Sequence, residues 1–123
     1  MPWTATFIAE FGIVETTHAG RLTPEELREA VAATLGLASE RKTHRYLGDC
    51  TGLEHGASVS DTYALTRFYE TLPIDRLSKE AILLPASQDA ETDMRFYETL
   101  TRNRGFDVRV FRTRQEAISW LVE

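Results

Sequence analysis

The alternation of hydrophobic and polar positions divides the chain into strands and helices. Residues 4–10 and 12–17 are rich in β-branched and aromatic side chains with little helical periodicity, so they predict two strands joined as an antiparallel hairpin. Residues 79–85 contain a run that is apolar at every position, which is typical of a parallel strand covered on both faces. Residues 45–50 and 108–111 predict two more strands, and the alternation in the second is that of an edge or half-exposed strand.

Four helices are predicted between and after these strands, and the first is the best specified. Thr23 and Glu26 form a capping box, with Pro24 at the first helical position, and the helix should run to about Ser39. Its core-facing stripe is predicted to consist of Leu27, Val31, Leu35 and Ala38. The other helices are expected from Ser58 or Ser60 to Pro73, over residues 89–104, and after a second capping box of Thr113 and Glu116.

This order of elements predicts an α/β fold. Each strand-helix-strand step is long enough for a right-handed crossover, so the last three strands should be parallel and the hairpin should supply an antiparallel edge. We therefore expect one domain over residues 1–123, with a mixed, mostly parallel five-stranded sheet and four helices in the order ββαβαβαβα. Residues 51–57, with two glycines and several polar side chains, are predicted to form a loop.

Composition adds exclusions to this picture. With 42% hydrophobic and 27% charged residues the chain has a globular composition, and its net charge of −5 argues against binding of nucleic acid. The lone Cys50 has no partner for an internal disulfide, and no signal peptide or run long enough to cross a bilayer is present. A cytoplasmic protein without membrane insertion is the expectation.

A family resemblance is carried by two parts of the chain. The first is the strand Arg45-Tyr46-Leu47-Gly48-Asp49-Cys50 with the loop and helix after it, and the second is the segment Asn103 to Phe111 followed by Glu116-Ala117 and Trp120-Leu121. Together they resemble the SpoIIAA-like or STAS-like domains of anti-sigma-factor antagonists, and most of all an uncharacterised bacterial branch of that group. The resemblance implies that a Ser or Thr at the start of the following helix accepts a phosphate from a partner kinase. Here Ser58 or Ser60 takes that place, within Ser58-Val59-Ser60-Asp61 instead of the family's Asp-Ser-Ser-Gly or Asp-Ser-Thr-Gly. The alternative is that the serine only caps the helix.

We therefore expect a non-catalytic STAS-like module, with no cofactor, that binds a protein partner or a small ligand through the loop of residues 49–61 and that is able to form a homodimer. The expected binding residues are Asp49, His55, Ser58, Ser60 and Asp61, and the candidate phosphoacceptors are Ser58 and Ser60.

Two other functional classes stay open. Six Phe and four Tyr would suit a carrier of apolar ligands such as lipids, as in the related CRAL-TRIO-type domains, although most of these side chains should belong to the core. An enzyme would use Cys50 as nucleophile with His44 or His55 as base, and it requires an accessible thiol. A single Cys at a strand end is more typical of a small buried hydrophobe.

Three further patterns are interpreted as structural. A metal site formed by His44, Asp49, Glu54, His55 and Asp61 has no diagnostic ligand spacing, so we predict none. The five arginines within residues 102–114 are interpreted as a solvated face. The sequence Arg-Phe-Tyr-Glu-Thr-Leu at residues 67–72 recurs at residues 95–100. Two explanations are a duplicated unit and two helices that meet one core with the same apolar spacing, and we favour the second.

Overall fold

A five-stranded sheet lies at the centre of the computed structural model, which describes residues 2–55 and 57–123. The strands lie side by side in chain order, with β1 antiparallel to β2 and every later neighbour parallel. The predicted α/β fold in the order ββαβαβαβα and its antiparallel edge hairpin are therefore confirmed. The strands are β1 (Trp3–Ile8), β2 (Ile13–Gly20), β3 (Arg45–Leu53), β4 (Lys79–Leu83) and β5 (Asp107–Phe111).

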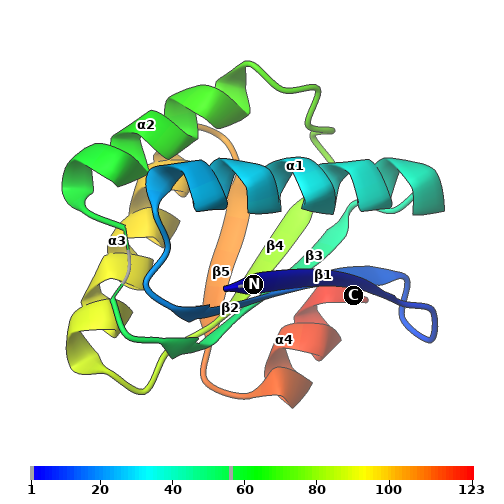
Figure 1. Ribbon diagram of the computed structural model, residues 1–123. Coiled ribbons are helices and arrows are strands. Elements are labelled where there is room, and N and C mark those ends of the chain that lie inside the picture. Colours follow the sequence, from blue (N-terminus) through cyan, green and yellow to red (C-terminus); the bar gives the residue numbers. More distant parts are fainter. Residues whose placement is uncertain (1, 56) are drawn as a thin grey trace.

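Three helices cover one face of the sheet and a fourth covers the other (Figure 1). Because the strands follow one another in chain order and βαβ crossovers are right-handed, all three connecting helices fall on the same face. These are α1 (Pro24–Arg41), α2 (Val59–Glu70) and α3 (Gln88–Asn103), whereas α4 (Arg114–Leu121) packs on the opposite face. No helix in residues 2–55 and 57–123 is long and apolar enough to cross a membrane.

The predicted helix starts are confirmed in detail at α1. The Glu26 amide donates to Thr23 Oγ1 over 3.1 Å, and the Thr23 amide donates to Glu26 Oε1 over 2.9 Å, which completes the capping box. At α4 only half of the predicted box forms. The Glu116 amide donates to Thr113 Oγ1 over 3.2 Å, but the Glu116 carboxylate accepts from the Thr113 hydroxyl instead of its amide.

The prediction of a loop over residues 51–57 is wrong for its first three residues. Thr51 to Leu53 continue β3, which pairs with β2 as far as Gly20 after a register shift between Thr17 and Ala19. Gly52 lies close to β2, since a Cβ at that position would be in van der Waals contact with the His18 carbonyl oxygen, 3.4 Å away. The connection to α2 therefore starts at Glu54.

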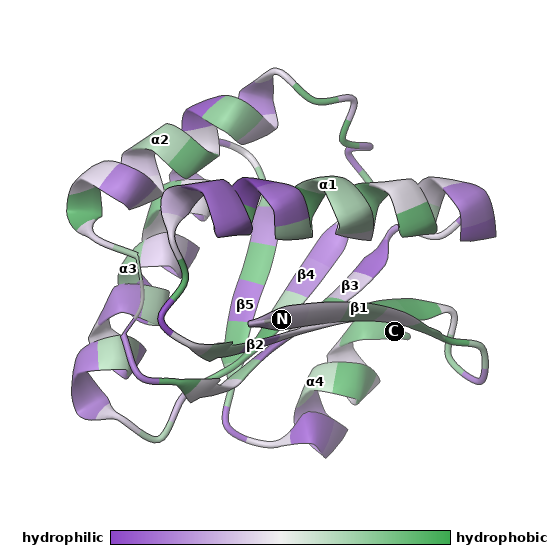
Figure 2. Cartoon of the chain, in the orientation of Figure 1, coloured by the Kyte–Doolittle hydropathy of each residue, from purple (hydrophilic) through white to green (hydrophobic). Residues whose placement is uncertain are grey.

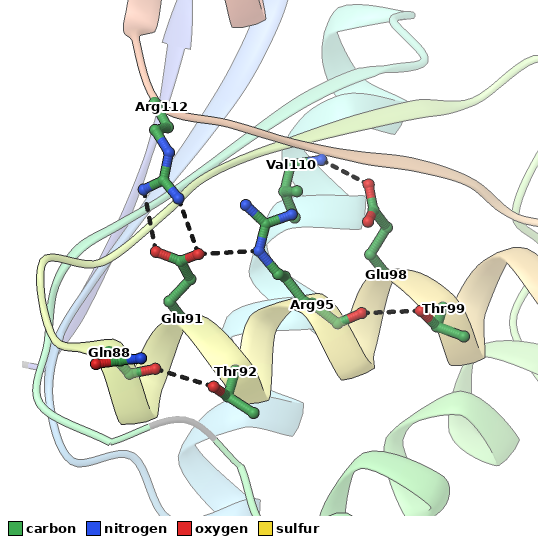
Figure 3. Close-up of polar contacts among 8 residues, drawn as sticks. All are labelled: Gln88, Glu91, Thr92, Arg95, Glu98, Thr99, Val110 and Arg112. Atoms are coloured by element: carbon green, nitrogen blue, oxygen red, sulfur yellow. Dashed lines mark hydrogen bonds and ion pairs between the residues drawn. The ribbon is translucent and has the colours of Figure 1, made fainter.

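Polar contacts fix α3 to the edge strand β5 (Figure 3). The Glu91 carboxylate accepts two hydrogen bonds from the Arg112 guanidinium, over 3.0 and 2.9 Å, and one from Arg95 Nε over 2.9 Å. About two helical turns after Glu91, Glu98 Oε2 accepts from the Val110 amide over 2.9 Å. Because β5 pairs only with β4, this last bond satisfies a donor on the otherwise open edge of the sheet.

Candidate functional site

The apolar stripe of α1 faces the sheet, but most of it is only half-buried. Of the predicted stripe only Ala38 is buried, whereas Leu27, Val31 and Leu35 keep accessible surface. The reason lies in the packing of the helices, because α1 rests on β1 and β2 while α2 packs mainly against α3. In Figure 2, α1 has hydrophilic residues at both ends and hydrophobic segments between them. Those half-buried side chains line a pocket of about 810 Å³.

The floor of this pocket is the middle of β3, with Tyr46, Gly48 and Cys50 among the lining residues. Residues at alternate positions of a strand share a face, so these three look toward the helices. Gly48 has no side chain, and the Ile82 side chain packs over it, since a Cβ at Gly48 would lie 2.9 Å from Ile82 Cδ1. Ile82 therefore contributes to the pocket floor beside Gly48.

A chain of hydrogen bonds reaches from α2 through α3 to a carboxyl group of β4. The Tyr97 hydroxyl donates to Glu80 Oε1 over 2.6 Å, and it therefore accepts from the Tyr69 hydroxyl, 2.9 Å away. All three residues line the pocket. Burial raises the pKa of Glu80, which favours its neutral form, while the Tyr97 hydrogen bond acts in the opposite direction. Burial also raises the pKa of Tyr69 and Tyr97, and the nearby Glu80 carboxyl raises both further.

The sequence held two signals for this cluster that were not recognised as functional. Tyr69 and Tyr97 occupy the same position in the two copies of Arg-Phe-Tyr-Glu-Thr-Leu, so the repeat brings two equivalent hydroxyls together, and that of Tyr97 bonds to Glu80. Glu80 precedes Ile82 by two residues in β4, and this spacing places its carboxyl on the same face of the sheet as Ile82.

Two further polar groups at the pocket lack partners. Among the side chains of residues 2–55 and 57–123, His18 Nδ1 and Ser78 Oγ are the buried nitrogen and oxygen atoms without a hydrogen bond. Both residues line the pocket. Burial lowers the pKa of His18, which favours the neutral imidazole, although the nearby Asp49 opposes this shift. Ser78 still interacts with the hydroxyl group of Tyr46. Buried polar atoms nearly always have a partner in the protein, in water or in a ligand, so His18 Nδ1 marks the pocket as a place for one.

The structure separates the five binding residues that the sequence predicted. His55 lies exposed at the rim of the pocket, whereas the other four do not line it. Asp49 Oδ1 accepts from the Thr51 amide and hydroxyl, over 3.0 and 2.6 Å. Ser58 is the N-cap of α2, since its Oγ accepts from the Asp61 amide over 3.1 Å, and Ser60 lies exposed in the first turn. The capping role considered for Ser58 is thus present, and only Ser58 and Asp61 are brought together.

Cys50 is 3% exposed and belongs to the core under α2 and α3. Burial raises the pKa of its thiol, and the Glu80 and Asp49 carboxyls raise it further. The interpretation as a small buried hydrophobe agrees with this environment, whereas the accessible thiol that an enzyme based on Cys50 requires is not found. No group of three His, Cys, Asp or Glu side chains in the described part of the chain is placed to hold a metal ion.

Comparison with known proteins adds no assignment to this geometry. No protein-family model, curated protein or solved structure matches the chain significantly, so the proposals below depend on the pocket and its chemistry.

Proposed function

We propose that the protein binds a small, mostly apolar molecule in the pocket between α1 and α2. The observation that carries this proposal is the half-buried stripe of Leu27, Val31 and Leu35 over a space of about 810 Å³. Ligand pockets commonly measure about 300–1,000 Å³ and are lined by apolar side chains with a few polar groups. A bound apolar molecule would remove this stripe from water, at roughly 25 cal/mol per Å² of apolar surface. This function corresponds to the carrier class expected as an alternative from the sequence.

Native mass spectrometry of the freshly purified protein tests the proposal. We expect a species heavier than the 14.0 kDa chain by one small molecule, which organic extraction releases. In a Val31→Phe variant the larger side chain should obstruct the pocket along α1 and reduce the species with the added mass. Val59→Phe is the matched control, because Val59 is 60% exposed and does not line the pocket.

Binding of a fluorescent probe to the ligand-free protein is a second test of the proposal. If the purified chain carries nothing, the neutral fluorescent probe N-phenyl-1-naphthylamine should still bind saturably to the wild type and to Val59→Phe, and weakly to Val31→Phe. A bare mass together with no saturable binding of this probe would contradict the proposal.

A cytoplasmic STAS-like module that binds a protein partner around residues 49–61 is our second proposal. It is supported by the exposed Val59 between two exposed serines, Ser58 and Ser60, beside the half-exposed Tyr63. A Val59→Asp variant should lose a partner that wild type and Val31→Phe both retain from a bacterial lysate. Equal recovery with all three proteins would count against this interface.

A further inference from the structure

Glu80 is a carboxyl group for which the described part of the chain supplies no basic partner. The ion pairs found in residues 2–55 and 57–123 do not include it. The neighbouring Lys79 points to the other face of the sheet, where its Nζ donates to the Trp120 carbonyl oxygen over 2.9 Å. Arg104, which lies at the pocket rim, is paired with Glu70. Without a cation beside it, burial favours the neutral form of Glu80, and a cationic partner in the pocket would make the ionised carboxylate favourable.

One oxygen of Glu80 is available for such a partner. Oε1 accepts from Tyr97, whereas Oε2 receives no hydrogen bond from the described residues. Gly48 lies beside Oε2, and the Ile82 side chain packs over Gly48, because a Cβ at Gly48 would lie 4.0 Å from that oxygen and 2.9 Å from Ile82 Cδ1. Glu80 lines the pocket, so a ligand group can approach Oε2 from the pocket side.

Several aromatic residues line the pocket together with Glu80. Tyr46 is the register partner of Glu80 on β3, so its side chain projects from the same face of the sheet. Tyr69 makes edge contacts with the rings of Tyr97 and Phe106, with centroid distances of 6.4 and 5.8 Å. All of these residues line the pocket. Aromatic faces attract cations and repel anions, so the rings and the carboxyl group favour the same sign of charge in a ligand.

On the basis of the binding function proposed above, we propose that the ligand is an amphiphile with a cationic amine head, which pairs with Glu80 while its alkyl part lies along the stripe of α1. An ammonium group offers three donors and no acceptor, which suits the available Oε2. A carboxylate head would face Glu80 with the same charge. A hydroxyl head would gain a hydrogen bond there but no charge pairing.

Competition among three ligands of equal chain length tests the head group. Octylamine, octan-1-ol and octanoate are each titrated against wild-type protein loaded with N-phenyl-1-naphthylamine, and the probe fluorescence is followed. We expect octylamine to displace the probe at a roughly tenfold or more lower concentration than octan-1-ol, with octanoate the weakest. Octanoate equal to or better than octylamine in the wild-type protein would overturn the proposal, whatever the variants show.

Variants assign the preference to Glu80. In Glu80→Gln we expect the preference for octylamine over octan-1-ol to disappear. Glu29→Gln is the matched control and should keep this preference, because Glu29 is exposed on α1 and does not line the pocket. A preference that persists in Glu80→Gln would overturn the proposal.

The two proposals fail in different ways. If the probe binds saturably and all three competitors displace it alike, the pocket is a binding site and the amine head is wrong. If neither the probe nor any of the three competitors binds to the protein, the proposed binding function is wrong and the amine proposal is wrong with it.

Discussion

Glu80 is a residue whose environment opposes its ordinary ionisation. It lies on the covered face of the sheet with a tyrosine hydroxyl on one oxygen and no basic side chain of the described residues beside it. Its raised pKa means that the folded protein holds a proton there at pH values at which the unfolded chain has lost it. The free energy of unfolding should therefore depend on pH through this carboxyl group.

We predict that Glu80→Gln changes the pH dependence of stability. Above the ordinary pKa of 4.5, the folded state binds more protons at Glu80 than the unfolded state does, so the stability contributed by this group is lost as pH rises through the raised pKa. The variant lacks this loss, so its stability relative to wild type should rise as pH increases from acid to neutral. Urea unfolding of both proteins from about pH 4 to about pH 8 measures the difference.

The other titrating groups around the pocket do not confuse this comparison. The lowered pKa of His18 makes stability rise with pH up to its ordinary value of 6.5, but wild type and variant share this contribution. Tyr46, Tyr69, Tyr97 and Cys50 all have raised pKa values and stay protonated over this range. Parallel stability curves for the two proteins would show that Glu80 titrates as it does in the unfolded chain.

Ser58 gives a second prediction at the scale of one residue. Ser58→Ala removes the acceptor of the Asp61 amide at the start of α2 and should lower the free energy of unfolding by about 1 kcal/mol. Ser60→Ala, in the exposed first turn, should change it by less than about 0.5 kcal/mol. Chemical unfolding of both variants checks this, and equal losses would mean that the cap contributes little.

At the scale of elements, α3 protects the free edge of β5. Glu98→Ala would leave the Val110 amide without its acceptor, so we predict a loss of about 1 kcal/mol in the free energy of unfolding. An open strand edge also promotes pairing between molecules, and size-exclusion chromatography should show more self-association. Thr99→Ala on the exposed side of the same helix is the control, and both variants behaving alike would argue against this role.

Local signals predicted most of the elements correctly. The capping box of Thr23 and Glu26 and the run of apolar residues in β4 depend on neighbours in sequence, and both were readable. The continuation of β3 through Thr51 to Leu53 was not, because it depends on a register shift in β2, more than 30 residues earlier in the chain.

The pocket was hidden from the sequence for a related reason. Helical spacing identified Val31 as inward-facing, but spacing does not tell whether a neighbouring helix closes over it. Here α1 rests on β1 and β2 while α2 packs against α3, and this arrangement is a property of the tertiary structure. The pattern also favoured polar loop residues, such as Asp49 and Ser60, as the site, whereas Glu80 and Tyr97 looked like parts of ordinary elements.

At the scale of the whole molecule, Cys50 reports on opening of the core. Cys50 lies in the cluster with Leu53, Leu65 and Ile82 and is only 3% exposed, so a reagent should reach its sulfur mainly when this face opens. We predict that iodoacetamide labels the folded protein far more slowly than the urea-unfolded chain, and that the rate rises with sub-denaturing urea. Fast labelling of the native state would restore an accessible thiol and with it the case for an enzyme.

The order of strands in the sheet bears on how the chain is assembled. Each strand pairs with the strand made just before it, so a chain growing on the ribosome can add one strand-helix unit at a time without leaving a gap for a later segment. The face that holds Ile13, Leu47 and Leu83 stays uncovered until residues 114–121 have been synthesised. We expect nascent chains halted before α4 to resist proteolysis at the sheet. They should also expose an apolar surface to which chaperones can bind.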